Sequence, residues 1–200
     1  MNGKMIEITT GDGAAMAAYL ALPASGSGAG LVLLQEIFGV NQSLRETADL
    51  FAEEGYVTIV PDLFWRIEPG VDLGYSEAEF GRAIELMGKF DLDQGIEDIG
   101  ATLRALRAMV ACTGKAGCIG FCLGGKLAYL TAARQDVDVA VSFYGVGIEG
   151  HLGESGNISC PLQMHFGGLD QHVPEAAVAK INGHFEGNDD VEIYIYPDAD

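Results

Sequence analysis

A cysteine at position 122 stands between small residues in a pattern that could perform nucleophilic catalysis. The motif Gly120-Phe121-Cys122-Leu123-Gly124 lies where an apolar stretch that predicts a strand passes directly into a predicted helix. This is a nucleophile elbow with cysteine in the place of serine, and its tight turn requires small residues two positions before and after the nucleophile. The thiol would lie at the N-terminus of the helix, whose dipole favours a thiolate. The Leu123 N–H would point to the same place and could bind an oxyanion. A simple tight turn is the alternative in a chain with 28 glycines, but the strand before and the helix after favour a nucleophile.

An acid and a base that could complete a triad are expected later in the chain, in the order nucleophile, acid, base. Asp170 follows a predicted strand at residues 161–166, at the carboxyl end where ligand sites of α/β proteins collect. An ordinary loop or capping aspartate is the alternative. The base should follow the last predicted strand, 191–196, but no histidine stands between that strand and Asp200.

The histidines of the chain lie at positions 151, 165, 172 and 184. We interpret His165 as a core or near-site residue of a strand, and His172 as a residue that could line the site. His172 is too close to Asp170 in sequence to make an ordinary triad with it. His151 and His184 are interpreted as surface residues. The base is therefore missing from the sequence as given.

Strand-like and helix-like patterns alternate from residue 30 onward, which predicts an α/β fold with a mostly parallel central sheet and helices on both faces. Before them, the first 22 residues predict an antiparallel hairpin at one sheet edge, with Gly11-Asp12-Gly13 at the turn. Capping boxes at Ser43/Glu46 and Ser76/Glu79 predict two helix starts. Each is followed by apolar residues at helical spacing: Leu44, Ala48 and Phe51 in the first helix, and Phe80, Ile84 and Met87 in the second. The predicted strands are 30–35, 56–60, 115–121, 138–144, 161–166 and 191–196. A long amphipathic helix is predicted at 96–110, where one apolar stripe is formed by Ile96, Ile99, Leu103, Leu106 and Val110. Further helices are predicted from 123 and from 174. We expect one domain over residues 1–200.

Composition excludes several classes of function. The formal net charge is −18, from 29 acidic and 11 basic residues, so nucleic-acid binding is not expected, because phosphate contacts need clustered Lys and Arg. No signal peptide or membrane span is recognised. The four cysteines show no metal-ligand spacing, so we expect free thiols, a cytoplasmic protein and no metal or organic cofactor.

Four ordered motifs resemble the dienelactone hydrolase family. They are Gln35-Glu36-Ile37-Phe38-Gly39, Pro61-Asp62-Leu63-Phe64, Gly120 to Gly125, and Gly167 to Pro174. The resemblance implies a single-domain α/β-hydrolase fold with a Cys-His-Asp triad. It implies that Cys122 is the nucleophile, that Asp170 orients the base, and that the Ile37 and Leu123 N–H groups form the oxyanion hole. It also implies that Glu36 contacts the resting thiol and takes up its proton; from sequence alone Glu36 could equally be a surface residue at a strand end. The family histidine matches a point just past Asp200, so we expect a chain cut short, without the histidine and a final helix.

The substrate is less closely defined by the resemblance. Dienelactone hydrolases hold the substrate carboxylate with two arginines, one of which would fall beyond Asp200. The other aligns with Phe80, and the nearest arginine, Arg82, would point about 200° away on a helix. We nevertheless name Arg82, Tyr144 and Phe38 as candidates for substrate contact.

The predicted function is hydrolysis of a lactone or small ester through Cys122. A general carboxylesterase or thioesterase of the same fold is the alternative, as is an inactive binding protein if residue 200 is the true C-terminus. The expected partner is a small-molecule ester or lactone, and the oligomeric state is not predicted.

Overall fold

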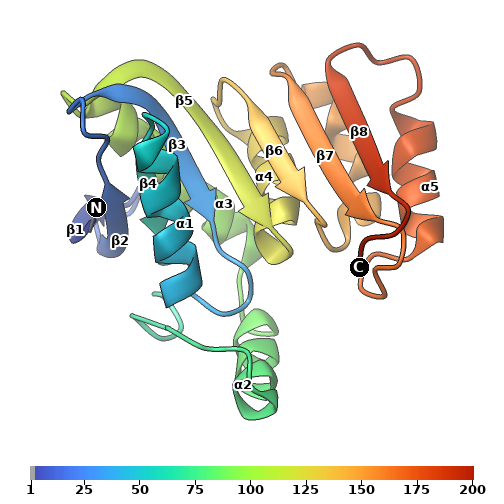
Figure 1. Cartoon of the computed structure of the whole chain (residues 1–200), viewed down its shortest axis with the longest axis horizontal. Coiled ribbons are helices and arrows are strands. Elements are labelled where there is room, and N and C mark those ends of the chain that lie inside the picture. The colour runs from blue at the N-terminus through green and yellow to red at the C-terminus, as the bar shows by residue number, and fades with distance from the viewer. Residues whose placement is uncertain (1–2) are drawn as a thin grey trace.

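The computed structural model describes residues 3–200 and contains an eight-stranded sheet with the order β1-β2-β4-β3-β5-β6-β7-β8 (Figure 1). Six strands run parallel to one another, and adjacent strands are joined by crossovers. They are β3 (Gly28–Leu34), β4 (Val57–Pro61), β5 (Cys112–Phe121), β6 (Ala140–Phe143), β7 (Leu162–Gly167) and β8 (Val191–Tyr196). The predicted fold class is confirmed, and most boundaries agree within two or three residues.

The N-terminal hairpin forms one edge of the sheet. Strands β1 (Lys4–Thr9) and β2 (Ala15–Ala21) pair antiparallel, and β2 pairs antiparallel with β4. The turn spans the five residues between the strands and is closed by the Thr10 N–H, which donates to the Ala14 carbonyl at 2.9 Å. Gly13 takes φ +84° within it, a conformation that favours glycine. The predicted hairpin is confirmed, with a longer turn than expected.

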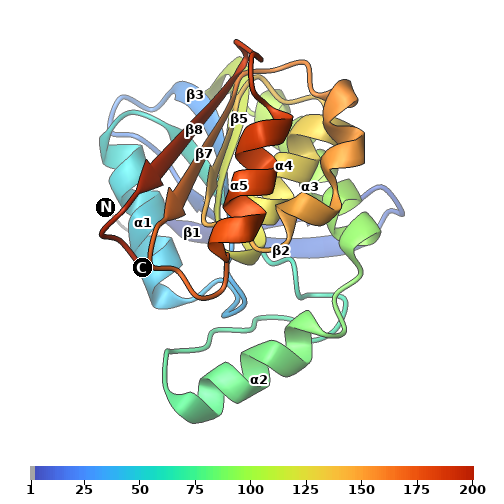
Figure 2. The same ribbon diagram turned by 90° about the vertical axis from the view of Figure 1, so that its right-hand side faces the viewer.

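Helices cover both faces of the sheet (Figure 2). Helix α1 (Gln42–Glu53) lies on one face, and α3 (Leu92–Ala108), α4 (Leu123–Arg134) and α5 (Glu175–His184) lie on the other; two short 3-10 helices, Ile148–Gly150 and Leu152–Asn157, follow β6. Leu44 and Ala48 of α1 are buried, as are the residues of the predicted stripe of α3 from Ile96 to Leu106. The apolar periodicity of these helices therefore identified the faces that they bury.

Two predicted helix ends are wrong. Helix α1 is capped by Asn41, whose side-chain oxygen accepts from the Leu44 N–H at 3.0 Å, so Ser43 lies inside the first turn and forms no capping box. Helix α3 ends at Ala108, and Val110, predicted on its buried stripe, is fully exposed beyond the end. The second capping box is confirmed: the Ser76 and Glu79 side chains each accept from the backbone N–H of the other.

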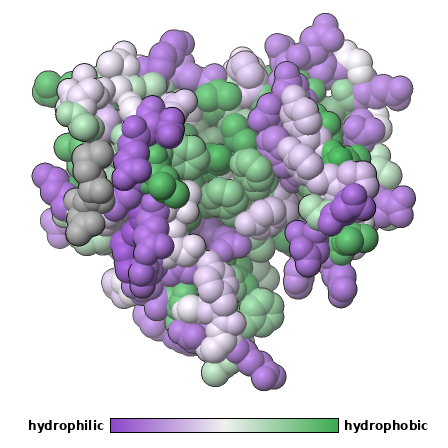
Figure 3. Space-filling view, in the orientation of Figure 1, coloured by the Kyte–Doolittle hydropathy of each residue, from purple (hydrophilic) through white to green (hydrophobic). Residues whose placement is uncertain are grey.

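An aromatic row crosses the face of the sheet that carries α1. The Phe121 and Phe143 rings stack at 5.3 Å, His165 stacks on Phe143 at 4.4 Å, and Tyr194 follows at 5.1 Å. Phe121 and Phe143 pack against the same cluster as the buried residues of α1. Figure 3 shows apolar side chains gathered in the hollow between α1 and β8.

Helix α2 (Glu77–Met87) lies apart from the sheet, beyond the carboxyl ends of β3 and β5 (Figures 1 and 2). It buries Ala83 and Leu86. Phe80, Ile84 and Met87, which predicted this helix by their spacing, remain 41%, 42% and 40% exposed. Their apolar face is therefore not part of the core.

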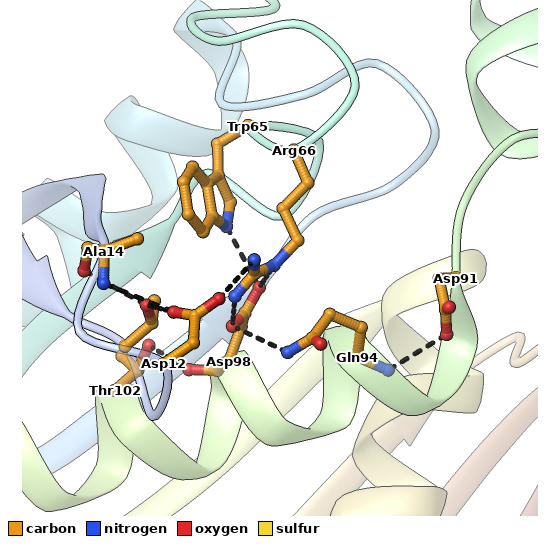
Figure 4. A network of polar contacts seen from close by, with 9 residues as sticks. Asp12, Ala14, Trp65, Arg66, Asp91, Gln94, Asp98 and Thr102 are labelled. Carbon is orange, nitrogen blue, oxygen red and sulfur yellow. Dashed lines mark hydrogen bonds and ion pairs between the residues drawn. The ribbon is translucent and has the colours of Figure 1, made fainter.

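A buried carboxylate ties the segment after β4 to α3 (Figure 4). Asp98, whose side chain is 2% exposed, accepts two hydrogen bonds at 2.9 Å from the Arg66 guanidinium and one at 3.0 Å from the Trp65 indole N–H. The same guanidinium donates to Asp12 in the β1–β2 turn at 2.8 Å. The Arg66 guanidinium thereby joins the β1–β2 turn and α3 to the segment after β4.

Within residues 3–200, no helix has the length and apolar character needed to cross a membrane.

Candidate active site

Cys122 occupies a strained turn between β5 and α4. Its backbone has φ +55° and ψ −113°, and it is the N-cap residue of α4. Strain of this kind in a residue other than glycine persists only where the surroundings impose it. Here the Cys122 N–H donates to the Phe143 carbonyl at 3.1 Å, and the Cys122 carbonyl accepts from the Lys126 N–H at 3.2 Å.

The flanking glycines are required by close backbone approach. A Cβ atom at Gly120 would lie 2.0 Å from the Gly124 carbonyl oxygen, and one at Gly124 would lie 2.3 Å from the Leu34 carbonyl oxygen. Neither contact is sterically allowed. The prediction that both positions must be small is confirmed, and the strand–turn–helix context of the elbow is present.

The Cys122 thiol is neutral at rest. Burial, together with the nearby Glu36 and Asp170 carboxylates, raises its pKa to about 11, against a lowering by the hydrogen bond from the Leu123 N–H. The helix N-terminus therefore does not suffice to hold a thiolate here, contrary to the expectation from the dipole alone. The thiol must lose its proton when a substrate arrives.

Glu36, directly after β3, is held by two tyrosines. The Tyr144 hydroxyl lies 3.4 Å from Oε1 and the Tyr75 hydroxyl 3.3 Å from Oε2. Burial raises the pKa of this carboxyl, and the two hydroxyl hydrogen bonds oppose the rise. Glu36 is thus a half-buried, perturbed carboxyl beside the thiol, which is the environment of a proton-transfer group.

The segment that carries Glu36 and Ile37 is anchored on both sides. The buried Gln35 side chain accepts from the Leu63 N–H at 3.0 Å and donates to the Glu36 carbonyl at 3.3 Å. The Leu73 N–H donates to the Phe38 carbonyl at 3.0 Å. Ile37 and Leu123 both line the cavity beside Cys122, so the predicted oxyanion pair is brought to one place.

Asp170 lies on the loop between β7 and α5, as predicted. Its Oδ1 atom accepts from the backbone N–H groups of His172 at 2.7 Å and Val173 at 3.3 Å. Its carboxylate is close enough to Cys122 to raise the pKa of the thiol. One oxygen is engaged by the loop itself.

The structure does not bring a histidine ring into hydrogen bonding with Cys122 or Asp170 within residues 3–200. His165 lies between Tyr196 and Gln163, with both ring nitrogens 2.9 Å from an oxygen. His151 pairs with Glu154 and His184 with Ser155. His172 lines the cavity, as predicted.

These residues surround a cavity of about 590 Å³. Its volume is in the range of small-molecule sites, about 300–1,000 Å³. Phe38 and Tyr144, both predicted to contact substrate, line it. The lining residues are Glu36, Ile37, Phe38, Phe80, Ile84, Met87, Phe90, Leu92, Cys122, Leu123, Lys126, Tyr144, Val146, Asp170, His172 and Asp200.

Arg82 is not brought into this cavity. Its guanidinium forms ion pairs with Glu68 and, at 3.0 Å, with Glu85 on the outer side of α2. Phe80, which stands two positions earlier, lines the cavity instead. The helical geometry that placed Arg82 about 200° from Phe80 accounts for this.

Sequence reasoning missed Tyr75, Gln35 and Lys126 as site residues. Tyr75 precedes the Ser76 cap of α2 and reaches Glu36 across the fold, and no local pattern marks such a contact. Lys126 is four residues after Cys122 on α4, a spacing that places it one turn along the helix and could have been noticed. Within the described residues there is no group of three or more His, Cys, Asp and Glu that could hold a metal ion.

A mostly parallel sheet, an elbow at the end of β5 and an aspartate on the loop after β7 define an α/β hydrolase with cysteine at the elbow. A sequence model of the dienelactone hydrolase family matches residues 16–200. "Putative carboxymethylenebutenolidase" of Azospirillum brasilense is 42% identical over 98% of this chain and 85% of its own length. Carboxymethylenebutenolidase of Pseudomonas putida is 37% identical over 97% of this chain and 83% of its own length.

Solved structures agree with the sequence relatives. The "Putative Dienelactone Hydrolase" of Klebsiella pneumoniae subsp. pneumoniae superposes with a TM-score of 0.85 and 26% identity, over 99% of this chain and 86% of that one. The chain therefore belongs to the dienelactone hydrolase family, a family of hydrolases.

Proposed function

We propose that this protein hydrolyses a lactone or small ester through a covalent thioester on Cys122. The observation that carries the proposal is the meeting of Cys122, Glu36 and the Leu123 N–H at one cavity. The relatives named carboxymethylenebutenolidase support a lactone as the substrate.

Glu36 takes the thiol proton in the first step. The two groups are neighbours, since the Glu36 charge raises the pKa of Cys122. The thiolate then attacks the carbonyl carbon, and the electron pair of the C=O bond moves to oxygen. The Ile37 and Leu123 N–H groups stabilise that oxyanion, an effect worth about 3–4 kcal/mol for one such donor in other hydrolases.

Collapse of the tetrahedral intermediate breaks the bond to the alcohol oxygen, and the proton that Glu36 took from the thiol passes to that oxygen. An ester then releases its alcohol, whereas an opened lactone keeps the new hydroxyl group on the acyl chain of the thioester. Water then attacks the thioester and releases the acid. This attack expels the Cys122 thiolate, and it needs a general base that takes a proton from the water. Asp170 has the position of the acid that orients a histidine in that role. A carboxylesterase or thioesterase of the same fold would use the same sequence of bond changes.

The chain offers a direct test, because acylation and deacylation depend on different groups. With p-nitrophenyl acetate, we expect a burst of about one p-nitrophenolate per chain followed by slow turnover, because no histidine ring within residues 3–200 is bonded to Asp170. Added imidazole should accelerate the slow phase by supplying a base in solution.

The control is Cys122→Ala, which should abolish the burst. A burst retained in that variant would overturn Cys122 as the nucleophile. Absence of any p-nitrophenolate release above that of Cys122→Ala would favour an inactive binding protein. Hydrolysis of dienelactone compared with p-nitrophenyl acetate would separate a lactonase from a general esterase.

Three further expectations stand as parts of this proposal. We place the protein in the cytoplasm, which the free state of its four cysteines supports. We treat residues 1–200 as one domain, which the continuous sheet supports. We propose no nucleic-acid partner, which the net charge of −18 supports.

A further inference from the structure

The apolar face of α2 lies on the cavity of the nucleophile. Phe80, Ile84 and Met87 follow one another at i, i+4 and i+7, the spacing of a single helix face. All three line the cavity that contains Cys122. Half-exposed apolar side chains at this spacing are available to a bound molecule, since the core does not use them.

This face is continuous with the segment beside the nucleophile. Phe38, two residues after Glu36, lies with its ring centroid 6.3 Å from that of Phe80. Phe90, Leu92 and Val146 extend the same apolar wall. A substrate whose carbonyl is at Cys122 would therefore meet apolar side chains in the direction of α2.

Among the described residues that line the cavity, carboxylates outnumber cations. Glu36, Asp170 and Asp200 supply carboxylates, and among the described residues that line the cavity Lys126 is the only cation. Arg82, the nearest arginine on α2, is paired with Glu68 and Glu85 outside it. A substrate carboxylate directed toward α2 would be placed among the apolar side chains of Phe80, Ile84 and Met87, where it loses hydration.

We propose that the cavity selects esters or lactones whose group facing α2 is uncharged and apolar, and that Phe80 and Ile84 set this preference. The proposed substrate class is thus an ester or lactone that presents an uncharged aliphatic chain or ring to α2. This inference rests on the proposed function, because it assumes that the reacting carbonyl binds at Cys122.

The test measures alkylation of Cys122, which needs no turnover. N-ethylmaleimide, N-hexylmaleimide and 6-maleimidohexanoic acid are compared; the last two have chains of equal length that end in a methyl group and a carboxylate. The adduct at Cys122 is quantified by peptide mass spectrometry. The half-exposed Cys112, at the far end of β5, is measured in the same digest and corrects for the intrinsic reactivity of each reagent.

Each methylene buried against the apolar wall can raise the rate of alkylation by up to about fourfold. We therefore expect the hexyl reagent to alkylate Cys122 at least about tenfold faster than the ethyl reagent. The carboxylate reagent should be at least about tenfold slower than the hexyl reagent. Phe80→Gln/Ile84→Gln should reduce the hexyl-to-ethyl ratio to about twofold or less. Leu50→Gln, at an exposed apolar position of α1 outside the cavity, should leave the ratio unchanged.

A reaction of the carboxylate reagent that is as fast as that of the hexyl reagent, or faster, would overturn the proposal. If Lys126→Met then abolished that reaction, Lys126 would be the group that binds the carboxylate. An unchanged hexyl-to-ethyl ratio in the double glutamine variant would also overturn the proposal. Failure of the proposed function appears separately, as the absence of a p-nitrophenolate burst, while the alkylation ratios still report on the wall.

Discussion

The Tyr144 hydroxyl lies 3.4 Å from Oε1 of Glu36, a residue 108 positions earlier in the chain. Tyr144 holds this place with a backbone φ of +40°, one of two positive values outside glycine in the described chain. The other belongs to Cys122, so both strained residues belong to the site. Strain concentrated in this way indicates that the fold is adapted to position these side chains.

Tyr144→Phe should shift the acid side of the pH–rate profile for acylation to higher pH. The hydroxyl hydrogen bond lowers the pKa of Glu36 against the dominant effect of burial, which raises it. Without the hydroxyl the pKa of Glu36 rises further. Glu36 accepts the thiol proton only when ionised, so acylation is present above its pKa and is lost as pH falls through it. The burst rate with p-nitrophenyl acetate between pH 4 and 8 measures the shift.

Tyr56→Phe is the matched control, since Tyr56 contacts Phe51 outside the cavity. It should leave the profile where it was. A Tyr144→Phe profile that falls in amplitude with its midpoint unmoved would assign Tyr144 a packing role alone.

The Cys122 thiol should react with iodoacetamide at a rate that rises about tenfold per pH unit from 7 to 10, because the thiolate fraction grows that way below the pKa. Burial and the Glu36 charge raise the pKa to about 11. For an ordinary cysteine, with a pKa near 8.5, the alkylation rate would level off about two pH units lower. The site of alkylation is resolved by peptide mass spectrometry.

Glu36→Gln should speed this reaction at pH 8 by roughly three- to tenfold, since it removes a negative charge beside the thiolate. The rise should still continue above pH 9, because burial is the larger cause and remains. Glu46→Gln, on the exposed side of α1, is the charge-matched control. Equal rates in the two variants would contradict a direct effect of Glu36 on the thiol.

Much of the site could be predicted because it depends on backbone geometry that leaves a local trace in the sequence. The elbow requires glycine at 120 and 124 for steric reasons, and it must join a buried strand to a helix. Asp170 follows a strand whose position in a parallel sheet fixes the edge at which it lies. Cys122, Ile37, Leu123 and Asp170 are accordingly brought to one cavity.

The contacts between side chains distant in sequence could not be predicted. The approach of Tyr75 and Tyr144 to Glu36 depends on how the loops before α2 and after β6 cross the cavity. Periodicity identified the apolar face of α2 but not that it would line a cavity. Asn41 and Ser43 are both good capping residues, so only the path of the chain decides between them.

Gly124→Ala should destabilise the protein by about 1–3 kcal/mol or more, because the new methyl group would overlap the Leu34 carbonyl oxygen and move the backbone. Displacement of the elbow should also reduce acylation by roughly a hundredfold, the usual consequence of misplacing a reacting group by about 1 Å. Urea unfolding and burst kinetics measure the two effects.

Gly183→Ala on α5 provides the matched control. A Cβ atom there meets nothing within 4 Å. Replacing a helical glycine should stabilise the protein by up to about 1 kcal/mol. If both substitutions had the same small effect, the close approach at the elbow would not constrain position 124.

Asp98→Ala should reduce the free energy of unfolding by about 2–4 kcal/mol, the lower value reflecting the partial exposure of its partner. The carboxylate is 2% exposed whereas Arg66 is 28% exposed. Removal of the Asp98 carboxylate leaves the Arg66 guanidinium and the Trp65 N–H without this acceptor, so the segment after β4 is no longer held to α3. Arg82→Ala breaks two surface ion pairs with side chains 38–64% exposed and should change the free energy of unfolding far less, because solvent screens these charges. Urea unfolding of the two variants, together with Arg66→Ala and the Arg66→Ala/Asp98→Ala double variant, gives the coupling energy directly. Additive effects of the two single substitutions would mean that the buried carboxylate and Arg66 do not stabilise the fold through each other.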